Sequence, residues 1–239
     1  MQIAVPQLYL DAGSFAAGGE FAKDSDRPLG FASGAKSISC LDLACGNMRF
    51  ENFLAERFPG LQVEAAVVDS CLPLIARARC KPDSFIESDI VSDLVSGDLG
   101  DKLPGNQDLV VCFGFMHHVF GDALRTMLLH LLFDRLAPGG VMCVSFWSFL
   151  SDARLSAKAQ EMTPIASKAL GLAGNELQAG DYFLGWQERS DVFRYCHSFT
   201  PTEVSSMAKR FEGEAKCYRF GADGRSGSLN EYLVLVRER

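Results

Sequence analysis

The sequence has few of the residues that usually hold a metal ion or a disulfide framework. Among 239 residues there are four histidines, and the eight cysteines form no C-x-x-C pair and no metal-ligand spacing with those histidines. Cys40, Cys112 and Cys143 lie in apolar runs, where cysteine behaves as a small hydrophobic residue. We therefore expect neither a metal site nor disulfides.

Long apolar runs and an excess of basic charge are also absent. No apolar run reaches the roughly 18 residues of a membrane span, and the first residues lack a basic region followed by an apolar core. We therefore expect a cytoplasmic protein without a membrane partner. The formal net charge of −7 argues against broad electrostatic binding to nucleic acid. The basic groups Arg77, Arg79, Lys81 and Lys209, Arg210 indicate solvated helix ends, with a local patch as the alternative.

What the sequence does contain is a strand-turn-helix pattern in residues 38–49, which read ISCLDLACGNMR. An apolar run meets a turn of small residues, and side chains at helical spacing follow it: Phe50, Phe53, Leu54 and Phe58. This pattern indicates the first unit of a doubly wound α/β sheet, whose ligands bind beyond the carboxyl ends of the strands. The next predicted strand, residues 63–68, ends in Asp69. An acid about 20 residues past a glycine turn accepts hydrogen bonds from a ribose, so we expect a nucleoside-containing cofactor.

Two features favour S-adenosylmethionine (SAM) over a dinucleotide as that cofactor. Asp42 lies inside the end of the first strand, where dinucleotide sites have apolar residues, and the G-x-G-x-x-G fingerprint is absent. Four segments, in order, resemble the motifs of class I SAM-dependent methyltransferases. They are LDLACGNMR (41–49) for D-x-G-C-G-x-G, Ser88-Asp89-Ile90 for the adenine segment, and residues 108–119 and 136–147 for the fourth and fifth strands. Ala44 and Met48 stand where this family has glycines.

This resemblance implies an α/β fold with a Rossmann-like, doubly wound, seven-stranded and mostly parallel sheet whose last strand is antiparallel. Residues 1–239 would form a single domain with SAM as its cofactor. Its parts would be an N-terminal lid (1–37), a cofactor-binding core (38–147), a substrate-covering insertion (148–199) and a final helix and hairpin (200–239). The expected cofactor-binding residues are Asp42, Ala44, Cys45, Gly46, Asn47, Asp69, Ser70, Asp89, Ile90, Phe113 and Gly114. For Asp89, the alternative is the cap of a helix.

Periodicity and turn residues predict the remaining elements. Leucines at spacings of three and four predict a helix over 124–132, and Thr200-Pro201-Thr202-Glu203 predicts a capped helix start. The other expected elements are a helix from Cys71 to Cys80, a strand over 84–87, a strand over 110–113, a turn over 138–140, a strand over 141–147, a helix over 151–170, and strands over 215–220 and 230–236.

The catalytic candidates lie where the fourth strand reaches the carboxyl edge of the sheet. His117 or His118 is the candidate base for a hydroxyl or amine acceptor, with lining of the pocket wall as the alternative. A carboxylate acceptor would need no base, only a cationic clamp such as Arg194 or Arg27. In the aromatic-rich stretch that follows, Trp186 and Tyr195 are candidates for stacking on a substrate, with simple packing as the alternative.

A narrower resemblance concerns residues 194–199, RYCHSF. This run is similar to the R-Y-Y-H-x-F segment of the wobble-uridine tRNA (carboxymethyl) methyltransferases, which esterify a carboxymethyl group and often act with a small partner protein. The resemblance implies a tRNA acceptor, an activating partner, and Tyr195 and His197 as substrate-binding residues, although Cys196 replaces an aromatic. The alternatives are a small-molecule acceptor, or a non-catalytic SAM-fold regulatory protein in which the loss of two glycines has weakened the site.

Overall fold

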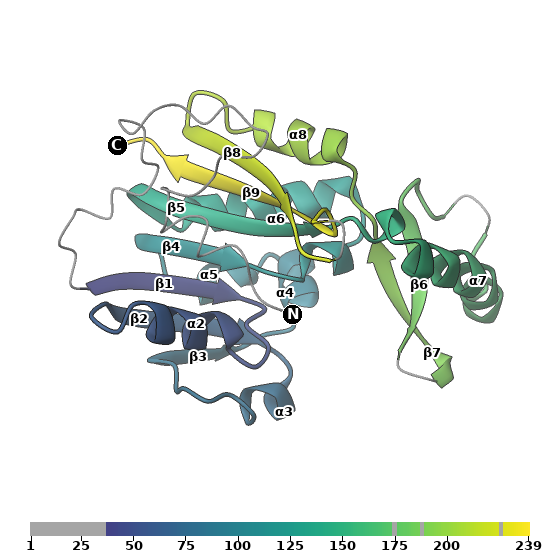
Figure 1. Cartoon of the computed structure of the whole chain (residues 1–239), viewed down its shortest axis with the longest axis horizontal. Helices are drawn as coiled ribbons and strands as arrows, with labels where there is room; N and C mark the ends of the chain where they lie inside the picture. Colours follow the sequence, from purple (N-terminus) through teal and green to yellow (C-terminus); the bar gives the residue numbers. More distant parts are fainter. Residues whose placement is uncertain (1–36, 174–175, 187–188, 225–226) are drawn as a thin grey trace.

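A computed structural model of the chain describes residues 37–173, 176–186, 189–224 and 227–239. The expected N-terminal lid and Arg27 lie outside the described residues. A seven-stranded sheet has the strand order β3-β2-β1-β4-β5-β9-β8, and a separate hairpin pairs β6 with β7 (Figure 1). The strands are β1 (Ser37–Leu43), β2 (Gln62–Asp69), β3 (Ser84–Glu87), β4 (Gln107–Cys112), β5 (Leu136–Trp147), β6 (Asp181–Trp186), β7 (Arg189–His197), β8 (Ala215–Ala222) and β9 (Asn230–Arg237).

Helices alternate with the parallel strands along the chain. They are α2 (Arg49–Arg57), α3 (Leu72–Ile75), α4 (Ile90–Ser96), α5 (Leu99–Lys102), α6 (Asp122–Asp134), α7 (Ala153–Leu170) and α8 (Pro201–Lys209), with short 3-10 turns η1 (Met116–His118) and η2 (Phe149–Ser151). In the described part of the chain, no helix combines the length and the apolar character that crossing a membrane requires.

Each central strand is apolar on both sides, because helices cover both faces of the sheet. In β1, Leu41 and Leu43 pack in a cluster with α4, α5, α6 and α8, whereas Ile38 and Cys40 pack on the opposite face with α2. The same two-residue alternation holds in β4, β5 and β9. Burial of one large aliphatic side chain contributes about 1.5–3 kcal/mol, so these strands supply most of the core.

The topology confirms the predicted fold class. Strands β1 to β5 pair in parallel, and β9 lies antiparallel between β5 and β8. The predicted start of α8 is also confirmed, because Thr200 and Glu203 form a reciprocal capping box and Pro201 occupies the first turn.

Three predicted boundaries are wrong. Strand β4 begins at Gln107 rather than at Val110 and ends at Cys112. The helix expected from Cys71 to Cys80 is a single turn, α3, which buries none of its residues and therefore gains little from tertiary packing. Strand β5 begins at Leu136 rather than at Val141, because the expected turn at 138–140 is an irregularity inside the strand. The register with β4 shifts there, Gly139 has a φ of 81°, and Pro138 has no N–H to donate.

Residues 148–199 leave the sheet at the carboxyl ends of its parallel strands. Helix α7 and the hairpin of β6 and β7 stand beyond that edge (Figure 1). The Asp152 carboxylate caps α7 by accepting a hydrogen bond from the Leu155 N–H. The Thr163 hydroxyl on α7 accepts a hydrogen bond of 3.0 Å from the backbone N–H of Phe183, which joins the helix to β6.

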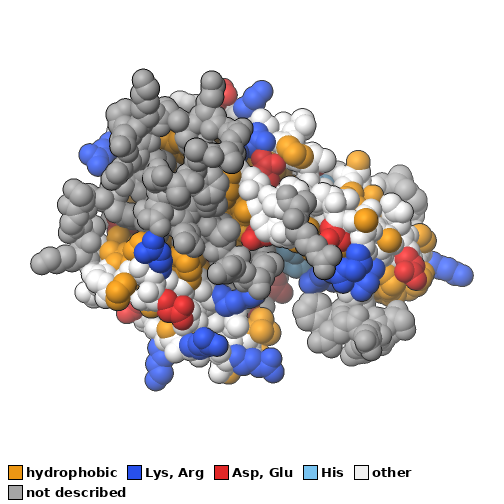
Figure 2. All heavy atoms as spheres, in the orientation of Figure 1, with side chains coloured by type: hydrophobic (Ala, Val, Ile, Leu, Met, Phe, Trp, Pro, Cys, Tyr) orange, Lys and Arg blue, Asp and Glu red, His pale blue; other side chains and the backbone are white. Residues whose placement is uncertain are grey.

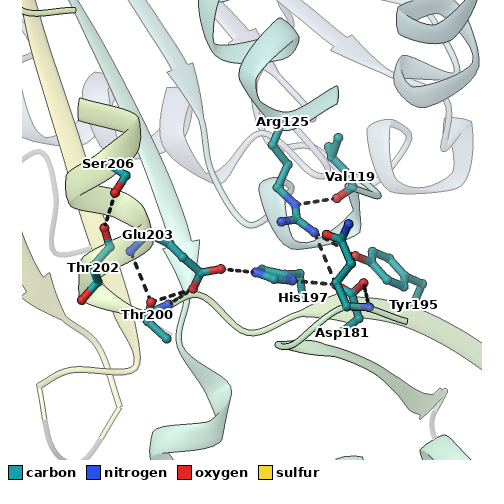
Figure 3. A network of polar contacts seen from close by, with 10 residues as sticks. Val119, Arg125, Asp181, Tyr195, His197, Thr200, Thr202, Glu203 and Ser206 are labelled. Carbon is teal, nitrogen blue, oxygen red and sulfur yellow. Dashed lines mark hydrogen bonds and ion pairs between the residues drawn. The ribbon is translucent and has the colours of Figure 1, made fainter. Parts of the chain in front are cut away.

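A polar network joins this hairpin to the body of the protein (Figure 3). The Asp181 carboxylate at the start of β6 lies 3.4 Å from the Arg125 guanidinium of α6 and accepts a hydrogen bond of 2.6 Å from the Tyr195 hydroxyl of β7. The His197 ring lies between two carboxylates, with Nδ1 2.6 Å from Asp181 and Nε2 3.0 Å from Glu203 of α8. We call these five residues the hinge network.

Both charges at the centre of the hinge network are withdrawn from water. The Arg125 and Asp181 side chains are 2% and 0% exposed. Burial by itself would raise the pKa of Asp181, but hydrogen bonds from His197, Tyr195 and the Gln178 backbone hold that pKa below its usual value. Asp181 is therefore charged at neutral pH and neutralises Arg125.

We expect Asp181→Asn to lower the free energy of unfolding by about 3 kcal/mol, because the substitution leaves the Arg125 charge buried and uncompensated. Urea denaturation at pH 7 measures this change. Asp122→Asn is the matched control, because Asp122 forms an exposed ion pair of 3.2 Å with Arg210. The control should lose less than about 1 kcal/mol. Equal losses of unfolding free energy in the two variants would mean that the buried pair stabilises the protein no more than the exposed pair does.

Candidate cofactor and active site

The turn after β1 has an unusual backbone. Ala44, Gly46 and Met48 have φ values of 64°, 57° and 56°, which is the left-handed region that favours glycine. A non-glycine residue there costs roughly 1–2 kcal/mol. Hydrogen bonds compensate for this cost, because the Ala44 and Cys45 N–H groups both donate to the Val68 carbonyl and the Gly46 N–H donates to the Asp69 carboxylate.

Met48 does not obstruct the site. Its side chain is fully buried in a small cluster with Cys45, Ala65 and Val67, and it does not line the cavity described next. The backbone at this position does require positive φ, as the family glycine implies, but the bulk of the methionine points into the core. Methionine in place of glycine therefore does not reduce the space for a ligand.

A cavity of about 490 Å³ opens at the carboxyl edge of β1, β2, β4 and β5. This volume suits a small ligand. Eleven of the residues expected at the site line it: Asp42, Ala44, Cys45, Gly46, Asn47, Asp69, Phe113, Gly114, His117, His118 and Arg194. The structure thus brings together the turn after β1, the acid that ends β2, the histidine pair and the arginine of β7.

Several expected residues lie elsewhere. Ser70 is exposed and off the cavity, Asp89 caps α4 by accepting a hydrogen bond of 3.1 Å from the Ser92 N–H, and Ile90 is buried in the core. Tyr195 and His197 direct their side chains into the hinge network rather than into the cavity. The adenine role of Asp89 and Ile90 remains a prediction.

The side chain of Trp186, which ends β6, lies outside the described residues, as does Arg27.

Other residues that line the cavity were not among the expected site residues. They are Arg49, Phe50, Leu74, Phe115, Ser145, Trp147, Leu229, Asn230 and Tyr232. Asn230 and Tyr232 reach the site because antiparallel β9 pairs them with Trp147 and Ser145 at the end of β5. Their place in the cavity depends on a pairing between distant segments of the chain.

The two histidine rings contact each other at the cavity wall, tilted by 50°. Their ring centroids are 4.0 Å apart, and His117 also lies 4.9 Å from the Trp147 ring. Burial lowers the pKa of His117 well below its usual value, and the charges of His118 and Arg194 lower it further. Burial and the charge of Arg194 also lower the pKa of His118, although its bond with the Tyr195 carbonyl opposes this. Both rings are therefore neutral at pH 7.

A pair of buried acids lies on the other side of the site. Asp42 is 3% exposed and Glu51 of α2 is 6% exposed. Burial raises the pKa of Asp42 well above its usual value, and the charges of Glu51 and Asp69 raise it further. Burial also raises the pKa of Glu51. Asp42, the member of this pair that lines the cavity, offers an acceptor to a cationic ligand.

Comparison with solved structures shows which proteins share this architecture. A SAM-dependent methyltransferase of Methanosarcina mazei has a TM-score of 0.57 at 14% identity, with 85% of this chain and 93% of that chain covered. A SAM-dependent methyltransferase of Clostridium acetobutylicum has a TM-score of 0.54 at 14% identity, covering 86% of this chain and 85% of the other. The chain has the fold of these methyltransferases.

A third structure with this fold contains a cofactor product. The N-methyltransferase NodS of Bradyrhizobium japonicum, solved with S-adenosyl-L-homocysteine, has a TM-score of 0.50 at 14% identity over 87% of this chain and 81% of that chain.

Sequence comparison alone is less informative. No protein-family model matches the chain. A Synechococcus protein described as uncharacterized is 26% identical over 115 residues, which are 48% of this chain and 27% of that protein. The match therefore spans about a quarter of the relative's length.

Glu51→Gln tests the buried acid pair. Below the pKa of an unfolded glutamate, about 4.3, the acid is protonated in both states and its raised pKa has no effect on stability. As the pH rises above that value the unfolded chain loses the proton first, so the wild-type free energy of unfolding falls.

We expect Glu51→Gln to remove part of this fall and to be about 1 kcal/mol more stable than the wild type at pH 8, with little difference at pH 4. Thermal unfolding across this pH range measures the effect. Glu56→Gln on the exposed side of α2 is the control and should follow the wild type at every pH. A loss of stability at pH 8 would contradict a buried charge at Glu51.

Proposed function

We propose that this protein is a SAM-dependent methyltransferase. The observation that carries the proposal is the joint placement of the left-handed turn Ala44–Met48 and the Asp69 carboxylate on one cavity at the carboxyl edge of the sheet. Ligands of open α/β sheets bind at this edge. The M. mazei and C. acetobutylicum proteins with the same fold are described as SAM-dependent methyltransferases.

Asp69 has the geometry to hold a ribose diol. Its two oxygens already accept hydrogen bonds of 2.9 Å from the Gly46 N–H and 2.7 Å from the Cys71 N–H. These bonds fix the orientation of the carboxylate. Each carboxylate oxygen has two lone pairs, so one on each remains for a hydroxyl group.

The charges around the cavity suit a cofactor with a positive sulfonium. Asp42 and Asp69 lie on the side of β1 and β2, whereas Arg194 lies on the side of the hairpin. The oxygens of these acids would accept hydrogen bonds from the ammonium group of SAM and lie on the side that its sulfonium faces. Transfer removes the positive charge from sulfur, and the protein mainly contributes position and a water-poor site.

Arg194 makes an acceptor with an anionic group the best fit. Its guanidinium lies 5.9 Å from the centre of the Trp147 ring and lines the cavity beside the histidine pair. A carboxylate held there needs no base, because it already carries the lone pair that attacks the methyl group. A hydroxyl or amine acceptor would instead need His117 or His118 to take its proton.

We infer that this acceptor is a small molecule. A tRNA carrying a carboxymethyl uridine also offers a carboxylate, as the RYCHSF resemblance implies, with or without an activating partner protein. A tRNA, however, needs basic surface along its backbone. In the view of Figure 2, the Lys and Arg side chains of the described residues form separate groups and no continuous stripe. Arg210, which with Lys209 forms one of the two basic groups noted in the sequence, forms an ion pair with Asp122.

Calorimetric titration with SAM and with S-adenosylhomocysteine tests the cofactor part of this proposal. We expect micromolar binding of both ligands to the wild type. Asp69→Ala should weaken SAM binding at least tenfold. Asp69→Asn keeps one of the two acceptor oxygens for the backbone, so an equal loss in both variants would assign the loss to the ribose contacts.

Asp101→Ala, which removes an exposed acid of α5, is the control and should bind SAM like the wild type. Unchanged affinity in Asp69→Ala would remove Asp69 from the ribose role. Binding of neither ligand by the folded wild type would overturn the methyltransferase proposal and favour a non-catalytic protein with this fold.

A further inference from the structure

Three side chains with metal-binding atoms meet beside the cavity, two of which line it and one of which is buried next to them. His117 and His118 come from η1 after β4, and Cys196 comes from β7. One ligand atom from each residue lies within 4.8 Å of the others. The sequence gives no sign of this group, because α6, β5, α7 and β6 lie between the histidines and the cysteine along the chain.

The histidine nitrogens are set up as ligands. His117 is 6% exposed, and its Nδ1 has no hydrogen-bond partner among the described residues. A buried ring nitrogen without a partner costs free energy unless something binds there. His118 has its Nδ1 3.0 Å from the Tyr195 carbonyl. Because a carbonyl oxygen only accepts, Nδ1 carries the proton and Nε2 keeps a free lone pair, which is the usual arrangement of a metal-binding histidine.

The hinge network determines which way β7 presents its side chains. Tyr195 and His197 both point into the network, and successive residues of a strand point to opposite sides. Arg194 and Cys196 consequently turn toward the histidines. The network, together with the packing of Cys196 against Phe149 and Leu184, therefore holds the cysteine beside the histidine pair.

We propose that His117, His118 and Cys196 bind a thiophilic transition-metal ion of the Zn²⁺ type, with a fourth position open to the cavity. Two imidazoles and one thiolate suit Zn²⁺ and related ions, and three protein ligands with one open position are typical of reactive rather than structural sites. Ligand atoms around tetrahedral Zn²⁺ stand roughly 3.5 Å apart, so closure by about 1 Å through side-chain rotation completes the site.

Arg194 indicates what fills the fourth position. A Zn²⁺ ion with one thiolate keeps a single positive charge, and the Arg194 guanidinium on the same cavity adds another. The ion therefore takes an oxyanion, a carboxylate or phosphate, as its fourth ligand. This last step rests on the proposed function, in which the oxyanion belongs to the methyl acceptor, whereas metal binding itself does not depend on it.

Cobalt binding tests the site directly. The untagged full-length chain, stripped with a chelator, is titrated with Co²⁺ without SAM. We expect one equivalent of Co²⁺ to give a thiolate-to-cobalt charge-transfer absorption and tetrahedral visible bands, and one equivalent of Zn²⁺ to displace it. Zn²⁺ should also raise the melting temperature, because it binds the folded state.

Variants assign the ligands. Cys196→Ser should abolish the charge-transfer band, and His117→Gln should weaken Co²⁺ binding at least tenfold while keeping a folded protein by circular dichroism. Cys217→Ser is the matched control, because Cys217 is the exposed cysteine of β8, and it should bind like the wild type.

Two results would overturn the proposal: no charge-transfer band in the folded wild type, or a band that survives in Cys196→Ser. Because SAM titration is a separate measurement, a protein that binds SAM but no cobalt would refute the metal site alone. A protein that binds cobalt but no SAM would refute only the proposed function.

Discussion

The neutralisation of the buried Arg125 charge is the constraint on which the cavity depends. Arg125 belongs to α6, in the body of the protein, and its carboxylate partner Asp181 starts the hairpin beyond the sheet. A buried guanidinium without that partner would be costly, so the hairpin has to sit where Asp181 reaches it. His197 extends the same contact to Glu203 of α8, and the wall of the site is thereby tied to two helices of the core.

A second constraint acts at the opposite wall. The turn after β1 adopts a backbone that glycine would accept more easily, yet Ala44 and Met48 occupy two of its three left-handed positions. The neighbouring strand determines this conformation, because β2 supplies the Val68 carbonyl and the Asp69 carboxylate that receive the N–H groups of the turn. Local strain is tolerated where the surrounding structure over-determines the backbone, and such places are often ligand sites.

Between these walls the charges are separated. Acids lie beside β1 and β2, where Asp42 is accompanied by buried Glu51, whereas Arg194 and the neutral histidine pair lie beside the hairpin. A cationic cofactor and an anionic acceptor would therefore be drawn to different sides of one cavity. Their reacting atoms would meet near Trp147, whose ring contacts both His117 and Arg194.

Local sequence was enough to predict where the core strands lie along the chain, the turn after β1, the acid that ends β2 and the capped start of α8. These features follow from local periodicity and from residue types at short spacing, which a single stretch of chain carries within itself. Contacts between distant segments direct the Met48 side chain into the core and place Tyr195 and His197 in the hinge network, whereas α3 buries no residue in such contacts and is limited to one turn. The same kind of contact brings His117 close to Cys196. The distance between these two side chains depends on how β7 is held against the sheet, which no local sequence pattern encodes.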